Sequence, residues 1–167
     1  SRAGFVLGEG GVGLWLEPDE PGSSRPDAAR HGWILGVGES TAAVPLNQWP
    51  DSPEPLARTM RLALDDAGLT PDDVDVVYAS ANATTLLDRV EALALRQVFA
   101  GCAPVVTSIK GAIGESGAAG ASACAAALLC GRQGLVPPVA GLTESDPVTE
   151  GLALARTTTI APGPIVL

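Results

Sequence analysis

The chain has 167 residues and is acidic, with a formal net charge of −9 and a pI of about 4.4. An acidic chain without a basic cluster excludes nucleic-acid binding through phosphate contacts, and 46% hydrophobic residues exclude a disordered chain. No run approaches the ~18 apolar residues of a membrane-spanning helix, so no membrane partner is expected, and the length predicts one compact domain.

The N-terminal region predicts strands and a loop. Residues 4–17 (GFVLGEGGVGLWLE) place two short apolar runs on either side of a glycine-rich stretch, which is typical of a β-hairpin. Residues 18–31 are polar and proline-rich, and predict a surface loop that ends at His31, the only histidine. Residues 33–39 (WILGVGE) then predict a strand.

The rest of the chain alternates helical and strand patterns. A helix is expected to begin after a Ser52 cap, with Pro53 in its first turn, and to stop at Gly68. The further elements are strands over 74–79 and 103–107, helices over 86–100 and 115–130, and extended segments over 136–142 and 160–167. Buried strands that alternate with helices predict a layered α/β fold with a mixed, mostly parallel sheet.

The helix predicted over 115–130 is unusual because nearly all its side chains are Gly, Ala, Ser or Cys. Glycine costs up to ~1 kcal/mol per helical position relative to alanine, so such a helix needs a compensating reason. Close packing of other backbone on every face supplies that reason, and predicts a helix buried in the middle of a molecule. Since 167 residues can hardly cover it, a second layer from another chain or from absent residues is implied.

Polar residues gather just before and at the start of this helix: Thr107, Ser108, Lys110, Glu115 and Ser116. Lys110 is the only lysine of the chain. A lysine and a glutamate five positions apart at a helix start indicate a polar pocket that opens onto the helix. The alternative is a salt bridge or cap that only defines where the helix begins.

Three cysteines, Cys102, Cys124 and Cys130, have no spacing typical of a metal site, and one histidine cannot complete one. No metal is therefore expected. The odd number favours buried free thiols in a reducing compartment. The N-terminus also lacks the pattern of a signal peptide, so we expect a cytoplasmic protein.

Four motifs in order resemble the β-ketoacyl-ACP synthases of the thiolase superfamily. The segment 4–17 resembles that family's GFVxGEGAGxLVLE hairpin, and residues 62–77 (LALDDAGLTPDDVDVV) resemble its AL..AGL.P.DVD.V stretch. Asp88 and Glu91 match the family pattern GD..EA.AL. Residues 105–121 are similar to V.S.K...GH..GAAG, and residues 134–138 follow as its G..PP stretch.

The resemblance implies a thiolase-like layered fold and a place in fatty-acid or polyketide biosynthesis. Residues 1–17 would be the last hairpin of the N-terminal half, residues 18–31 a surface loop, and residues 32–167 a C-terminal half that is incomplete at its end. The family catalyses a decarboxylating condensation of substrates carried by acyl carrier protein, and needs no cofactor. A cysteine nucleophile holds the acyl chain, and two histidines stabilise the oxyanions.

The resemblance assigns three site positions with a mixed result. Lys110 stands at the family's lysine position. Ser80 stands in place of one catalytic histidine, and Glu115 in place of the other. The nucleophilic cysteine belongs upstream of residue 1, and none of the three cysteines here stands at its position.

These replacements favour a non-condensing subunit that resembles a chain-length factor. Its expected partners are a ketosynthase-like subunit, or a second copy in a homodimer, and acyl carrier protein. One alternative is a fragment of an active acyltransferase whose cysteine lies in the missing N-terminal part, with Ser80 or Glu115 supporting a variant transfer. Another is a purely structural dimerisation module without an acyl pocket.

Overall fold

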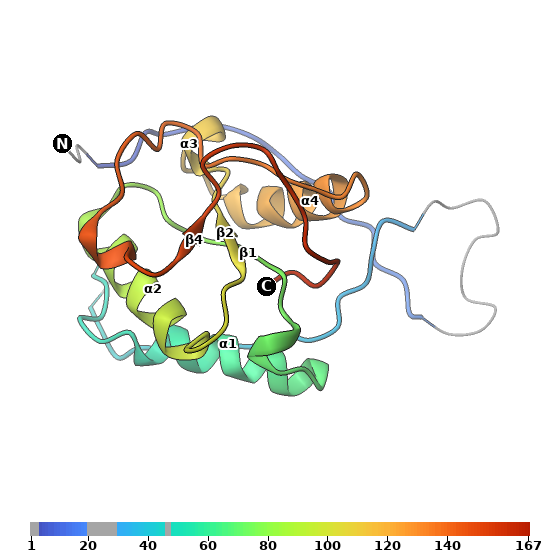
Figure 1. The fold of residues 1–167 in the computed structure, drawn as a ribbon, viewed down its shortest axis with the longest axis horizontal. Coiled ribbons are helices and arrows are strands. Elements are labelled where there is room, and N and C mark those ends of the chain that lie inside the picture. Colours follow the sequence, from blue (N-terminus) through green and yellow to red (C-terminus); the bar gives the residue numbers. More distant parts are fainter. Residues whose placement is uncertain (1–3, 20–29, 46–47) are drawn as a thin grey trace.

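The sheet at the centre of the molecule is parallel. The computed structural model describes residues 4–19, 30–45 and 48–167. In its main sheet the strand order is β1-β2-β4, and every pair is parallel. Residues 165–167 extend this sheet beside β1 through a parallel bridge between Val76 and Val166. The strands, drawn at the centre of Figure 1, are β1 (Val76–Tyr78), β2 (Val105–Thr107) and β4 (Ala153–Leu154).

Two amphipathic helices cover one face of this sheet. They are α1 (Glu54–Ala67) and α2 (Thr85–Val98), and they pack against each other. Helix α1 begins one residue later than predicted, at Glu54 with Pro53 as its N-cap, and the Ser52 hydroxyl accepts a hydrogen bond from the Glu54 amide. The predicted end of α1 is confirmed, because Gly68 ends the helix at φ 67°. Only glycine adopts this left-handed conformation without a steric cost.

The core lies between these two helices and the sheet. Apolar side chains of α1, including Ala57 and Leu64, meet Leu95 and Val98 of α2 over Val106 of β2. These residues recur at helical spacing along α1 and α2, which gives each helix one apolar stripe. Burial of these stripes against the sheet holds the ends of β1 and β2 in place.

The opposite face of the sheet carries smaller elements. Val76 and Tyr78 alternate with the core-facing Val77 and point to this side, as successive strand residues must. They cluster with Val136 of β3 (Leu135–Val136), which pairs antiparallel with β5 (Thr159–Ile160). Helix α4 (Ala119–Gly131) lies on this side too, since its Cys130 thiol approaches the Tyr78 hydroxyl. The short helices are α3 (Lys110–Ile113), η1 (Pro71–Asp73) and η2 (Pro147–Thr149).

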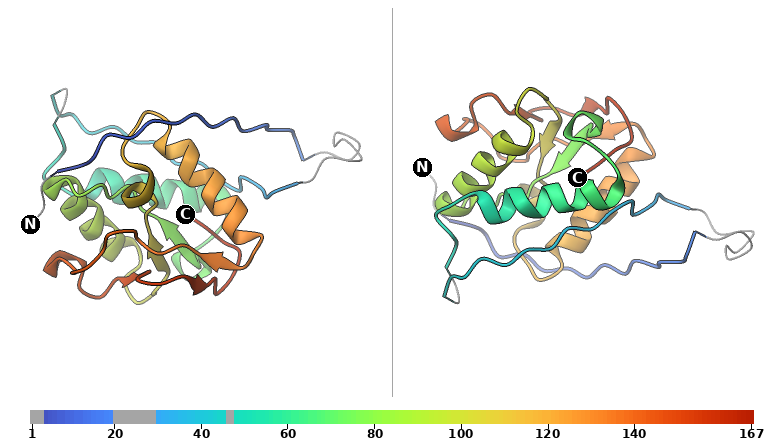
Figure 2. Two further views of the ribbon diagram at one scale, coloured as in Figure 1. Left: turned by 90° about the horizontal axis from the view of Figure 1, so that it is seen from above. Right: turned by 90° about the horizontal axis from the view of Figure 1, so that it is seen from below.

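The predicted hairpin over 4–17 and the predicted strand over 33–39 are not formed within this chain. Figure 2 shows both regions as long extended stretches that run toward the same side of the molecule. The one bridge of the first stretch joins Leu7 to Glu115, far along the sequence. No neighbouring strand in the described residues pairs with the second stretch. Most of the loop predicted over 18–31 lies outside the described residues.

The Gly/Ala-rich helix starts later than expected and is not buried by this chain. Helix α4 begins at Ala119 rather than Glu115, because Gly114 turns at φ 75° and ends α3 before it. Among its residues only Ala119 is buried, and Leu129 is 53% exposed. The 167 residues thus do not enclose this helix, as the sequence leads us to expect, and the second layer that would enclose it stays a prediction.

No helix in the described part of the chain combines the length and the apolar character that crossing a bilayer requires. The α/β class with a mostly parallel sheet, predicted from the alternation of strands and helices, is confirmed. The alternation identifies the layers because each buried strand needs a helix over it. The pairing partners of isolated extended segments are not encoded locally.

Candidate functional site

The candidate site forms where two neighbouring parallel strands end. Ser80 lies two residues after β1, and Lys110 lies three residues after β2. The Ala79 amide donates to the Thr107 carbonyl at 2.7 Å, so the segment that leaves β1 stays paired with the end of β2. The Ser108 hydroxyl then donates to the Ala81 carbonyl at 2.9 Å. In parallel sheets the carboxyl ends of strands are the usual place for sites, because loops from adjacent strands converge there.

Lys110 links the other two residues predicted for the site, Ser80 and Glu115. Its Nζ donates to the Ser80 hydroxyl oxygen at 2.9 Å and to Glu115 Oε2 at 2.8 Å. The side chains of Lys110 and Glu115 are only 12% and 23% exposed. The structure therefore brings Ser80, Lys110 and Glu115 into one hydrogen-bonded cluster, while their chemical role stays a prediction.

The backbone of Glu115 is held by the extended N-terminal segment. Its amide donates to the Val6 carbonyl at 2.8 Å, and its carbonyl accepts from the Gly8 amide at 2.9 Å. The two backbone segments come so close that a Cβ on Gly8 would lie 2.0 Å from the Ile113 carbonyl oxygen. A strand-like contact with residues 6–8 thus positions the side chain that faces Lys110.

Asn82 belongs to the same cluster. Its Nδ2 donates to Glu115 Oε2 at 2.6 Å, and its Oδ1 accepts from the Thr84 amide at 3.0 Å. Its own backbone amide donates to Asp88 Oδ1 at 3.0 Å. The loop after β1 therefore contributes both Ser80 and Asn82 to the site.

Glu91 lies beneath this loop on the buried face of α2. Its side chain is 7% exposed, and its Oε1 accepts from the Ser80 amide at 2.7 Å. Burial raises the pKa of Glu91 from its ordinary value of 4.5 to about 7, although the Ser80 amide and the positive charge of Lys110 oppose that shift. Its Oε2 is buried without a hydrogen-bond partner. Glu91 thus holds the Ser80 loop from below with a carboxyl group that resists ionisation.

Glu115 behaves in the opposite way. Partial burial acts to raise the pKa of its carboxyl group, but hydrogen bonds from Lys110 and Asn82 outweigh this effect and hold the pKa below its ordinary range. Glu115 is therefore a carboxylate at neutral pH. The ammonium group of Lys110 faces this negative charge directly.

The other candidate residues lie elsewhere. The expected buried thiols are wrong, because Cys124 is exposed while Cys102 and Cys130 are half-buried. The Cys102 thiol donates to Asp72, and this bond raises its pKa. His31 is exposed, with its Nδ1 2.9 Å from an Arg132 guanidinium nitrogen. In the described residues, no three His, Cys, Asp or Glu side chains are grouped so as to hold a metal ion.

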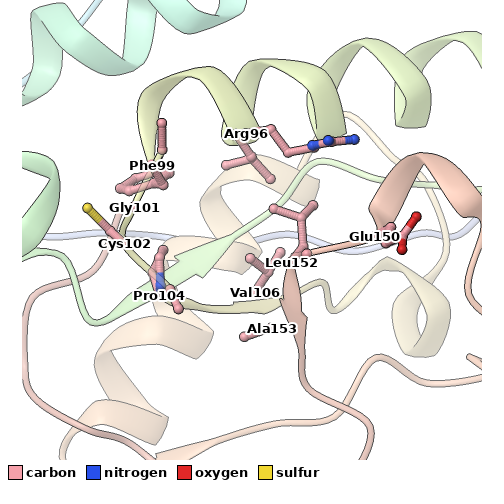
Figure 3. Close-up of a pocket in the computed structure, with 13 residues that line it drawn as sticks. Arg96, Phe99, Gly101, Cys102, Pro104, Val106, Glu150, Leu152 and Ala153 are labelled. Atoms are coloured by element: carbon pink, nitrogen blue, oxygen red, sulfur yellow. The ribbon is translucent and has the colours of Figure 1, made fainter.

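A cavity of about 210 Å³ opens beside the end of α2 and the beginning of β2, whereas Lys110 follows the other end of β2. Figure 3 shows its apolar side chains, among them Phe99, Val106 and Leu152, with Arg96 and Glu150 also along its wall. None of Ser80, Lys110 and Glu115 lines it. The cavity is thus separate from the predicted site.

Residues 31–143 match the family described as "Beta-ketoacyl synthase, C-terminal domain". The matched region includes the whole cluster around Lys110. The chain belongs to the β-ketoacyl synthase family. The predicted resemblance, and the C-terminal place of this chain within the family, are thereby confirmed.

Relatives of this ketosynthase domain include both polyketide and fatty-acid proteins. The tetracenomycin polyketide synthase ketoacyl synthase beta subunit of Streptomyces glaucescens is 43% identical over 140 residues, or 83% of this chain and 34% of that protein. The mitochondrial 3-oxoacyl-acyl-carrier-protein synthase of Arabidopsis thaliana is 34% identical, over 94% of this chain and 35% of that protein. The chain thus spans about a third of the length of these relatives.

Solved structures agree on the fold of the ketosynthase domain. The structure titled "The ishigamide ketosynthase/chain length factor" superposes with a TM-score of 0.72 at 31% identity, over 81% of this chain and 34% of that one. A β-ketoacyl synthase from Burkholderia phymatum gives a TM-score of 0.73 at 28% identity, over 80% of this chain and 32% of that one. The thiolase-like layered fold predicted from the motifs is confirmed.

Sequence analysis missed Asn82 altogether and gave Glu91 no place in the site. Glu91 carried a detectable pattern, because it shares the buried stripe of α2 with Leu87, Val90 and Ala94 at helical spacing. A charged residue in such a stripe indicates a buried polar partner. Asn82 carried no such pattern, since its contact with Glu115 spans 33 positions.

Proposed function

We propose that this chain is the C-terminal part of a non-condensing ketosynthase-like subunit that pairs with an active ketosynthase, in the manner of a chain-length factor. One observation carries the proposal. The site lysine, Lys110, is bound to a carboxylate and a serine hydroxyl where the family resemblance implies two imidazoles.

The chemistry of condensation makes these replacements unfavourable. Decarboxylation leaves an enolate, whose developing negative charge needs hydrogen-bond donors at the oxygen. Glu115 is held as a carboxylate by Lys110 and Asn82, so it would repel that charge. Ser80 can donate a hydrogen bond, but its side chain is shorter than an imidazole and already accepts from Lys110.

The names of the relatives support a role beside a second subunit. One is a ketoacyl synthase beta subunit, and one structural neighbour is titled ketosynthase/chain length factor. By analogy, the partner of this subunit is an active ketosynthase, and the pair acts on chains held by acyl carrier protein. A homodimer is the alternative assembly. We place the subunit in the cytoplasm, where free thiols such as Cys124 persist.

The test is a condensation assay on the full-length subunit that contains this chain. The subunit is incubated with malonyl-carrier protein alone and again with its ketosynthase partner, and released CO₂ and new ketoacyl products are measured by mass spectrometry. We expect product only from the pair. A ketosynthase of known activity serves as the positive control.

Two outcomes would contradict the proposal. Efficient decarboxylation and condensation by the subunit alone, with an acyl adduct on an upstream cysteine, would identify an active acyltransferase. A pair whose product length never changes when the subunit is varied, with no acyl chain bound near Lys110, would identify a structural dimerisation module instead.

A further inference from the structure

The orientation of the Asn82 amide is determined by its two neighbours. The Thr84 backbone amide can only donate, so the oxygen of Asn82 must face it, at 3.0 Å. The amide nitrogen is then turned to Glu115 Oε2, at 2.6 Å, where it can only donate. The Asn82 backbone is itself held by Asp88 of α2. Asn82 is therefore fixed at both its main chain and its side chain.

Glu115 Oε2 consequently receives two donors from different loops. Lys110 Nζ reaches it from the start of α3 at 2.8 Å, and Asn82 Nδ2 from the loop after β1. Charge-assisted bonds of this kind are the strongest that a carboxylate makes. The other charged groups of the cluster, Asp88 and Glu91, accept hydrogen bonds from the Asn82 and Ser80 backbone amides.

We propose that Asn82 is a positioning residue that locks the Glu115 carboxylate onto Lys110, so that this pair occupies the site and excludes the carboxylate of an incoming substrate. A free ammonium group at the end of two strands would attract a malonyl carboxylate. In this chain that charge is already neutralised from within. The inference rests on the proposed non-condensing function and names the device that enforces it.

The first experiment measures the titration of Glu115 by ¹³C NMR in the whole protein. In Asn82→Asp the Thr84 contact survives, but a second carboxylate faces Glu115, and like charges at this distance cannot both be ionised. We expect Glu115 to become about tenfold weaker as an acid. Asn82→Ala, which removes the donor without adding charge, should change it in the same direction by less.

The matched control adds one carboxylate far from the site. Gln133→Glu does so at an exposed position after α4, and should leave the titration of Glu115 unchanged. An identical pKa of Glu115 in Asn82→Asp, Asn82→Ala and Gln133→Glu would overturn the proposal. So would an Asn82→Asp effect no larger than that of Gln133→Glu.

The second experiment uses malonate as the probe and Lys110 as the reporter. The ¹⁵N signal of the Lys110 side chain is assigned by its loss in Lys110→Met. In the native protein we expect malonate to leave this signal unmoved. In Glu115→Gln we expect malonate to shift the signal saturably, with a dissociation constant at least tenfold lower than in the native protein. Equal malonate binding by the native protein and Glu115→Gln would disprove that the Glu115–Lys110 pair excludes a carboxylate.

These results are independent of the condensation assay. A subunit that condensed on its own while Asn82→Asp weakened the acidity of Glu115 would disprove the proposed function and retain Asn82 as the positioning residue. A subunit that did not condense on its own, and whose Glu115 titrated identically with and without Asn82, would disprove this inference but not the proposed function.

Discussion

Glu91 places a carboxyl group where the local sequence offers mainly apolar neighbours. It belongs to the stripe of α2 that packs into the core, and one of its oxygens has no hydrogen-bond partner. Its other oxygen accepts from the Ser80 amide. The cost of burying this group is offset by its hold on the loop that carries Ser80 and Asn82.

The raised pKa of Glu91 predicts a pH-dependent stability. The folded protein binds this proton up to a pKa of about 7, whereas the unfolded chain releases it near 4.5. Between these values the folded state holds more protons, so the free energy of unfolding should fall as pH rises, by ~3 kcal/mol in all. Thermal unfolding from pH 5 to 8 measures this fall.

Glu91→Gln should flatten that pH profile, because an amide keeps an acceptor for the Ser80 amide but has no proton to lose. The matched control is Glu144→Gln, which replaces an exposed glutamate outside the site. It should retain the slope of the native protein. A slope that survives Glu91→Gln would show that another group is responsible.

At the scale of elements, the site depends on an extended segment that belongs to no helix or regular strand. Residues 6–8 bond both backbone groups of Glu115. This contact requires glycines on both sides, since a Cβ on Gly114 would lie 2.7 Å from the Gly8 nitrogen. The loop between α3 and α4 is thus shaped by backbone that lies more than a hundred residues earlier.

Gly8→Ala should release this segment from Glu115. The added Cβ would lie 2.0 Å from the Ile113 carbonyl oxygen, which is backbone and cannot move aside easily. We expect a loss of ~1–3 kcal/mol in stability and faster hydrogen exchange at the Glu115 amide. Gly10→Ala is the matched control, because nothing lies within 4 Å of its added Cβ. Equal exchange in both variants would contradict this account.

At the scale of the whole molecule, several surfaces are built for contact but are open. Val6, Leu7 and Trp15 of the first extended stretch are exposed, as are Trp33 and Ile34 of the second. Helix α4 is small-sided and covered on one side only. Large apolar side chains that gather in exposed segments are typical of an interface. The relatives, about three times as long, have the residues to cover it.

The reactivity of Cys124 measures whether the complete protein has further residues that cover α4. Its thiol is exposed on α4 and should be alkylated readily by a maleimide in this chain. In the complete ketosynthase-like subunit we expect alkylation to slow by at least about tenfold, because the thiol becomes inaccessible. Cys102 is the internal control, since its bond to Asp72 keeps it a poor nucleophile in both forms. An unchanged rate at Cys124 would place the covering layer elsewhere.

Sequence patterns predicted those features that a short window of residues encodes. The end of α1 follows from Gly68, its start lies within one residue of the prediction, and the parallel sheet follows from buried strands that alternate with helices. The hairpin expected over 4–17 is not formed within this chain, and α4 starts later than predicted. The loop before α4 lies against Gly8, and this close approach of Gly8 to Gly114 is not recorded in any local pattern.

The acidic sequence with one lysine determined the family and the α/β class by itself and predicted three site positions, because motifs and hydrophobic periodicity are local properties. Only the tertiary structure decided how those positions interact. It turned Glu115 toward Lys110, added Asn82 as a second donor and placed Glu91 beneath the loop. Hydrogen bonds across 5 to 33 positions carry these decisions. The longest of them, from Asn82 to Glu115, forms only once the strands have brought their ends together.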